Sequence, residues 1–276
     1  YRGHKLAVNY AKERLQGRDI YKRDDKVIPI IEHSDVKRML LASKSYAEGS
    51  LALCLYCSKL VDEVDNIDSQ KLLSLLTPVA KTFPAEFGLL ANDLAIQVHG
   101  GYGYTRDFDV EQLYRDNRLN PIHEGTSGIQ SLDLLGRKII GDSGESLKIF
   151  TKRVVKTCDQ AIQTSLKSDA NYLLEVIENL ERVCEILINS KDSNTLANSS
   201  AFLTGFGHIV VGWIWLDMAI VALSQKDEDH YGQPFLNGKI ATMRYFFECE
   251  LPKADMLLNF VAKKSDVVSS VKTEFF

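Results

Sequence analysis

Apolar residues recur along this chain mainly at the three- and four-residue spacing that places them on one face of a helix. No stretch shows the two-residue alternation of a half-buried strand, so the pattern predicts an all-α protein. The helices expected in the first half cover residues 1–16, 35–64, 69–99, 110–118 and 127–140. Those expected in the second half cover residues 145–167, 169–190, 194–225 and 234–264.

Helix-breaking segments separate these helices. Residues 17–31, with the charged run 22–25, and residues 227–233 are expected to be loops. Pro78 and Pro84 are expected to kink or divide the helix over 69–99, because proline has no backbone N–H. The expected N-terminal caps are Asp107 or Asp109 for the fourth helix and Thr126 or Ser127 for the fifth.

The best linker in the chain is the glycine-containing segment 141–144. It predicts an antiparallel helical bundle over residues 1–141 and a second, smaller helical bundle over residues 145–276. The first residues are already helical in pattern and have no capping residue before them. We therefore expect the chain to be a C-terminal piece of a longer protein.

Composition and charge narrow the function classes. The chain has 276 residues, of which 45% are hydrophobic and 25% charged, which are ordinary globular values. A net charge of −4 argues against a nucleic-acid binder, which needs a basic surface. The cysteines are odd in number, five, and scattered, which fits a reducing compartment. Cys54 and Cys57 lie within one predicted helix, so packing is expected and no metal site.

The most apolar stretch, residues 202–223, is nearly long enough to cross a bilayer. His208 and Asp217 interrupt it, which favours a buried core helix over stable membrane insertion. We expect no targeting segment within these residues. The expected location is the cytoplasm if the source is bacterial and the mitochondrial matrix if it is eukaryotic.

Candidate chemistry is concentrated in residues 97–130. Gly100 and Gly101 end a helix, where they act either as a C-cap or as a turn that a ligand approaches closely. Arg115 and Asp116 form either a structural ion pair or part of a site. Glu124 stands on a loop just before a helix, in the position of a catalytic base or of a solvated loop acid.

Four segments in this order resemble the C-terminal helical domain of the acyl-CoA dehydrogenase family. They are residues 9–14 (NYAKER), 97–104 (QVHGGYGY), 114–116 (YRD) and 124–130 (EGTSGIQ). The resemblance covers residues 1 to about 141. Residues 145–276 resemble the extra C-terminal helical domain of the larger subgroup that includes 3-methylmercaptopropionyl-CoA dehydrogenase-like proteins.

The resemblance implies an oxidoreductase acting on CH–CH bonds, with FAD as cofactor and an acyl-CoA thioester as substrate. Glu124 matches the base that removes the α-proton, and Gly125 matches a residue near the thioester. The family assembles as homodimers or dimers of dimers, and Arg14 and Gln16 match residues that reach the flavin diphosphate across a subunit interface. The remaining positions that match cofactor contacts are His33, Gln97, Gly100, Gly101 and Thr126.

Two other functions remain open. One is a catalytically silent helical relative that serves as a binding or scaffold module. The other is a helical subunit that completes a heteromeric dehydrogenase. The electron acceptor and the acyl chain are not defined by these residues.

Overall fold

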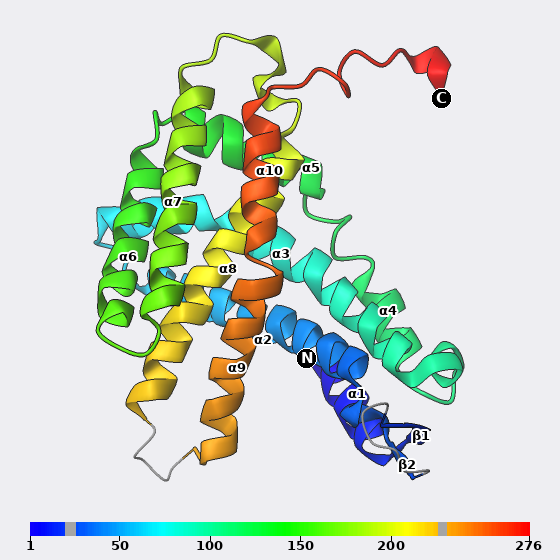
Figure 1. The fold of residues 1–276 in the computed structure, drawn as a ribbon. Helices are drawn as coiled ribbons and strands as arrows, with labels where there is room; N and C mark the ends of the chain where they lie inside the picture. Colours follow the sequence, from blue (N-terminus) through cyan, green and yellow to red (C-terminus); the bar gives the residue numbers. More distant parts are fainter. Residues whose placement is uncertain (20–25, 226–230) are drawn as a thin grey trace. The chain divides into compact units, whose positions relative to one another are not determined.

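The structure is a computed structural model that describes residues 1–19, 26–225 and 231–276. The described chain is mainly helical, which confirms the all-α prediction (Figure 1). Its α-helices are α1 (Arg2–Glu13), α2 (Ser34–Asp62), α3 (Ile67–His99), α4 (Val110–Asn117), α5 (Ser127–Leu132), α6 (Glu145–Ile162), α7 (Lys167–Ile188), α8 (Ser199–Ser224), α9 (Gln233–Cys249) and α10 (Pro252–Ala262).

Short elements connect the helices. The 3₁₀-helices are η1 (Ile30–Glu32), η2 (Gly100–Tyr104), η4 (Ser193–Leu196) and η5 (Thr273–Phe275), and η3 (Asp133–Ile140) is a π-helix. The loop prediction for residues 17–31 is wrong at its ends, where β1 (Leu15–Arg18) and β2 (Val27–Pro29) pair antiparallel. These strands have four and three residues, too few for a two-residue alternation to show. The charged run 22–25 and most of the expected loop at 227–233 lie outside the described residues.

Proline has different effects in two helices. The predicted division of 69–99 is wrong, because α3 continues through Pro78 and Pro84. Pro78 is flanked by the fully buried Leu76 and Val79, whose burial offsets a proline cost of about 3 kcal/mol. The predicted single helix over 234–264 is also wrong. Pro252 begins α10, where its missing N–H removes no helical hydrogen bond.

The contacts divide the chain into two compact units. Unit 1 consists of residues 1–51 and 83–123, and unit 2 of residues 52–82 and 124–276. The division passes through α2 and α3 and does not coincide with the expected boundary at 141–144, which stays a prediction.

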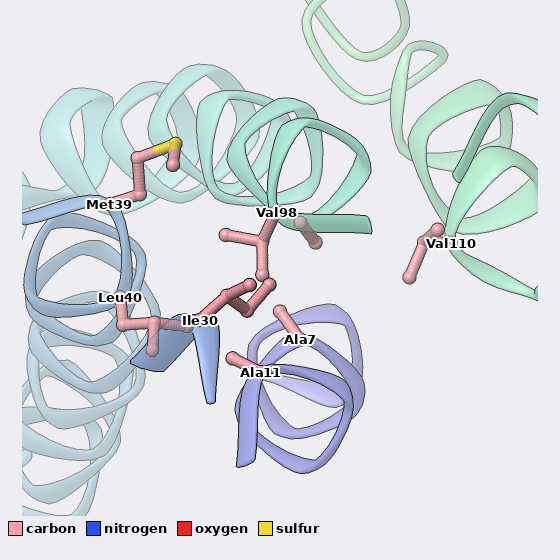
Figure 2. Close-up of a cluster of buried hydrophobic side chains, with 8 residues drawn as sticks. Ala7, Ala11, Ile30, Met39, Leu40, Val98 and Val110 are labelled. Atoms are coloured by element: carbon pink, nitrogen blue, oxygen red, sulfur yellow. The ribbon is translucent and has the colours of Figure 1, made fainter. Parts of the chain in front are cut away.

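The core of unit 1 is built on a face of small residues in α1. Gly3, Ala7 and Ala11 are buried and follow one another at four-residue intervals. A side-chain carbon at Gly3 would collide with the side chain of Asn92 in α3, which shows how closely the two helices approach. Ala7 and Ala11 face a cluster drawn from η1, α2, α3 and α4 (Figure 2). Its other buried members are Ile30, Met39, Leu40, Ala95, Val98 and Val110.

The core of unit 2 surrounds α8, which contacts α5, α6, α7, α9 and α10. By length and composition α8 could cross a membrane, but 72% of its most apolar stretch is buried in the structure. That burial agrees with the core-helix interpretation of the sequence. Phe150 of α6 packs edge-on against Trp213, whose indole Nε1 donates a hydrogen bond of 2.8 Å to Thr157.

A buried carboxylate lies at the turn between α9 and α10. Glu250 is 2% exposed, and its Oε2 accepts a hydrogen bond of 2.6 Å from the Lys253 ammonium. The same oxygen lies 3.6 Å from Nε2 of His208 in the middle of α8. The Lys253 ammonium offsets the cost of burying this negative charge, and the contact with His208 places the turn against α8.

Unit 1 generates a prediction for the pH dependence of stability. Nδ1 of His4 lies 2.7 Å from the Ser43 hydroxyl. Burial, with a smaller effect of the Lys44 ammonium, lowers the pKa of His4 to about 4. As the pH falls below the ordinary histidine pKa of about 6.5, the unfolded chain takes up this proton before the folded chain does. The free energy of unfolding therefore decreases by about 2–3 kcal/mol as the pH falls from about 6.5 to 4.

The measurement is urea unfolding across this pH range in the native chain and in a His4→Gln variant. Glutamine can still donate to Ser43 but cannot take up a proton, so the variant should lose less stability on acidification. An identical loss in both proteins contradicts the assignment.

Candidate active site

A surface pocket of unit 1 joins three segments that are far apart in the sequence. It has a volume of about 330 Å³ and lies where the end of α1, the start of α2 and the end of α3 meet. No carboxylate occurs among the described residues that line it. They are Tyr10, Arg14, Gln16, Gly17, Ile30, His33, Val36, Gln97, Val98, His99 and Gly100.

Arg14 supplies the strongest positive charge of this pocket. Its backbone N–H donates to the carbonyl of Tyr10 at 2.9 Å, and its carbonyl accepts from Ile30 N–H at 2.8 Å. The guanidinium donates to the Gln16 side chain at 3.3 Å and stands 5.8 Å from the ring centre of Tyr102. The backbone of Arg14 is thus fixed while its side chain stays exposed, which suits capture of an anion.

His33 is held on the opposite wall by β1. Its Nε2 donates a hydrogen bond of 2.8 Å to the carbonyl of Gln16. Gly17 has a φ of +76°, and a side-chain carbon there would lie 3.0 Å from the His33 ring. Glycine therefore allows both the left-handed backbone and the close approach of the imidazole.

The end of α3 forms the third wall. Gly100 has a φ of +61°, which ends the helix, and a side-chain carbon at Gly100 or Gly101 would meet nothing within 4 Å. Because no atom of the described residues occupies that space, a ligand can approach the backbone of both glycines. Gly103 differs, since a side-chain carbon there would lie 2.9 Å from the side chain of His99.

An aromatic stack supports the floor of the pocket. Tyr10 of α1 and His99 of α3 stack with ring centres 4.4 Å apart, and Phe108 packs edge-on against both. Nδ1 of His99 donates a hydrogen bond of 2.7 Å to the Ala95 carbonyl. Burial lowers the pKa of His99, so this ring is neutral at pH 7.

The loop that carries Glu124 belongs to unit 2. Glu124 has a φ of 54° and Gly125 a φ of 89°, so two consecutive residues adopt the left-handed conformation. For a residue other than glycine, this conformation costs about 1–2 kcal/mol. The Gln130 amide of α5 holds the loop by donating to the Glu124 carbonyl at 3.3 Å, and the Glu124 side chain is exposed.

Thr126 occupies the N-cap of α5, as one of the two predicted caps, but its side chain makes no capping hydrogen bond. Its carbonyl accepts from the Gln130 backbone N–H at 3.0 Å. The helix is anchored by the Ser131 hydroxyl, which lies 3.0 Å from that of Ser199 in α8. At α4, the predicted cap Asp109 makes no capping bond and instead accepts from Arg2 at 2.6 Å.

The structure thus brings part of the predicted site together. Arg14, Gln16, His33, Gln97 and Gly100 line one pocket, and Gly101 adjoins it in η2. Glu124, Gly125 and Thr126 form a separate loop in unit 2.

Several lining residues were missed by the sequence analysis. Tyr10 and His99 lie within the segments that carried the family resemblance, so they could have been identified there. Gln130 could have been identified in the same way. Its hydrogen bond to the Glu124 carbonyl could not be predicted from the sequence. The Arg115 guanidinium lies 4.0 Å from the Glu111 carboxylate. In the part of the chain that the structure describes, Arg115 and Asp116 form no ion pair with each other.

The cysteines give no sign of a second site. All five are free thiols, and burial raises the pKa of Cys57 to about 11, which suppresses the reactive thiolate. Among the described residues, no group of three His, Cys, Asp or Glu side chains could hold a metal ion.

Two protein-family models match the chain. Residues 2–139 match the model described as acyl-CoA dehydrogenase, C-terminal domain, and residues 150–272 match the one described as acetyl-CoA dehydrogenase C-terminal like. The chain belongs to the acyl-CoA dehydrogenase family. The pocket and the Glu124 loop both occur in or directly before helices that the first of these models covers.

Relatives in the acyl-CoA dehydrogenase family match most of the chain. A 3-methylmercaptopropionyl-CoA dehydrogenase of Ruegeria pomeroyi is 32% identical over 258 residues, covering 89% of this chain and 43% of that protein. A broad-specificity linear acyl-CoA dehydrogenase of Mycobacterium tuberculosis is 30% identical, covering 91% of this chain and 45% of that protein. The chain therefore spans less than half the length of these curated relatives.

Solved structures share the fold at lower identity. Caenorhabditis elegans ACDH-11, solved in complex with C11-CoA, has a TM-score of 0.76 at 20% identity and aligns with 99% of this chain and 44% of its own. A Bacillus anthracis acyl-CoA dehydrogenase complexed with FAD has a TM-score of 0.65 at 17% identity, covering 99% of this chain and 47% of its own.

The Glu124 loop generates a stability prediction. A Gly125→Ala variant should unfold more easily by about 1–2 kcal/mol, because its φ is 89° and the new carbon would lie 2.9 Å from the Gln130 amide nitrogen. Gly128→Ala, in the first turn of the adjoining α5, is the control, since the nearest atom to its new carbon would be 3.8 Å away. Thermal and urea unfolding of both variants check this. Equal stabilities would show that the loop is not held in this conformation.

Proposed function

We propose that this chain is the helical C-terminal part of an FAD-dependent acyl-CoA dehydrogenase that catalyses α,β-desaturation of an acyl-CoA thioester. The observation that carries the proposal is the pocket of unit 1. Five residues proposed as cofactor contacts, from three separate segments, line it together: Arg14, Gln16, His33, Gln97 and Gly100.

The pocket fits the diphosphate and adenosine side of FAD. The exposed Arg14 guanidinium can donate two parallel hydrogen bonds to a diphosphate. The space over Gly100 and Gly101 admits a ligand to the backbone, and among the described residues the lining carries no carboxylate that would repel an anion. The fixed imidazole of His33 and the Gln16 and Gln97 amides add further polar groups.

Glu124 is proposed as the base that takes the α-proton. Bound FAD supplies the acceptor for the hydride that leaves the β-carbon. The left-handed backbone at Glu124 and Gly125, with the Gln130 amide bonded to the Glu124 carbonyl, sets the backbone position from which the carboxylate extends. Backbone N–H groups around Gly125 and Thr126 are suited to the thioester oxygen, on which negative charge develops as the proton leaves.

Assembly is the remaining part of the proposal. We infer that the chain works in a homodimer or a dimer of dimers, in which Arg14 and Gln16 contact a flavin bound mainly by a neighbouring copy. The protein segments that relatives have beyond the span matched here would cover the flavin ring and the acyl chain. A chain that matches 43–45% of these relatives is expected to be inactive alone.

The test of the base is a Glu124→Gln variant in the full-length protein. Loss of a general base lowers the rate by about 10²–10⁴-fold. The variant should therefore keep its yellow flavin while acyl-CoA no longer bleaches it on the stopped-flow timescale. Bleaching at the native rate would remove Glu124 from this role, and absence of flavin from the native protein would favour the scaffold function.

The test of the cofactor pocket is an Arg14→Ala variant. Loss of a charged hydrogen bond to a diphosphate should weaken FAD retention by about tenfold or more. Arg106→Ala is the control, because Arg106 is an exposed arginine of the same unit outside the pocket. Flavin content after gel filtration measures the effect. Equal retention in the two variants would contradict the assignment.

A further inference from the structure

A second concentration of charge lies on the outer face of α6 in unit 2. Lys148, Lys152 and Lys156 follow one another at four-residue intervals, which places them in one row along the helix. Arg153 lies beside the row. The three lysines are exposed and Arg153 is half-buried. Like charges at this spacing destabilise a helix, so the row opposes the stability of α6 when no anion is present.

The described carboxylates of unit 2 form no direct ion pair with this row. In the described part of the chain, no salt bridge within 4.0 Å involves any of the four cations. Glu145, at the start of the same helix, is already paired with Lys71 at 2.6 Å. The row is basic on a chain whose net charge is −4, so it stands out from the average composition.

The row borders a hollow and not a flat surface. The hollow has a volume of about 620 Å³, within the range of about 300–1,000 Å³ that is typical of small-molecule sites. Ile149 and Val155 add apolar surface to the lining of this hollow. Asp68 and Asp159 also line it, and their carboxylates can accept hydrogen bonds from hydroxyl or amino groups.

We propose that this hollow binds a multiply phosphorylated organic molecule. Phosphate oxygens would be held by the row of ammonium groups and by the Arg153 guanidinium, and an apolar or planar group would rest on Ile149 and Val155. A single phosphate would engage part of the row only, because Lys148 and Lys156 are eight residues apart, or about 12 Å along the helix.

The phosphates could belong to the coenzyme A part of a thioester or to a separate nucleotide. No residue proposed for FAD, for the thioester or as the base lies on α6. The inference therefore stands independently of the proposed function and can fail without it.

The experiment is calorimetric titration of the chain with three probes: sodium tripolyphosphate, adenosine triphosphate and coenzyme A. The variant is Lys152→Gln combined with Lys156→Gln. The charge-matched control is Lys191→Gln combined with Lys263→Gln, two exposed lysines of the same unit outside the hollow. Circular dichroism verifies that both variants fold. Lys148→Glu serves as a second variant.

Saturable binding that weakens at least about tenfold in the variant, but not in the control, supports the site. Binding should also weaken as salt rises from about 0.05 to 0.3 M, because the groups are exposed. Tightest binding of coenzyme A identifies the thioester as the source, whereas tightest binding of adenosine triphosphate identifies a separate nucleotide. Equal loss in variant and control, or no saturable binding of any probe, overturns the inference.

Discussion

The close approach of α1 to α3 is the constraint on which the pocket of unit 1 depends. Gly3, Ala7 and Ala11 have little or no side chain, so the helix can lie directly against Asn92 and the apolar cluster. This packing fixes where α1 ends, and the hydrogen bond between the Arg14 carbonyl and Ile30 N–H then sets the start of η1. The position of the Arg14 guanidinium beside the end of α3 follows from helix packing more than from local loop structure.

Long periodic segments were predictable, and short or strained ones were not. The helical spacing located α2, α3, α4, α6 and α7 to within a few residues, because each buries one apolar face. The sequence pattern did not predict the β1–β2 pair, because its strands are too short to show a two-residue period. Proline was the least reliable signal of a helix end. At Pro78 its effect depends on the burial of the surrounding residues, and at Pro252 it depends on the turn that precedes α10.

The site was predictable in composition but not in geometry. The segments around Arg14, His33 and Gly100 were recognised by motif. Their spacing in the sequence does not indicate that they line one pocket. The left-handed conformation of Glu124 could not be foreseen, because glutamate rarely adopts it and only the Gln130 contact explains its persistence. The partners of the buried Glu250 carboxylate could not be predicted either, since they come from α8 and from the first turn of α10.

The passage of α2 and α3 through both compact units has a practical consequence for dissecting the protein. Residues 52–82 belong to unit 2: Tyr56 packs edge-on against Trp213, and Lys71 and Ser74 bond to Glu145 and Lys138. A truncation between residues 141 and 145, where the sequence suggests a clean cut, would remove this segment from α6 and α8. The isolated C-terminal fragment would then present uncovered apolar surface to water and tend to aggregate, whereas a fragment that retains the α2–α3 hairpin would keep that surface covered.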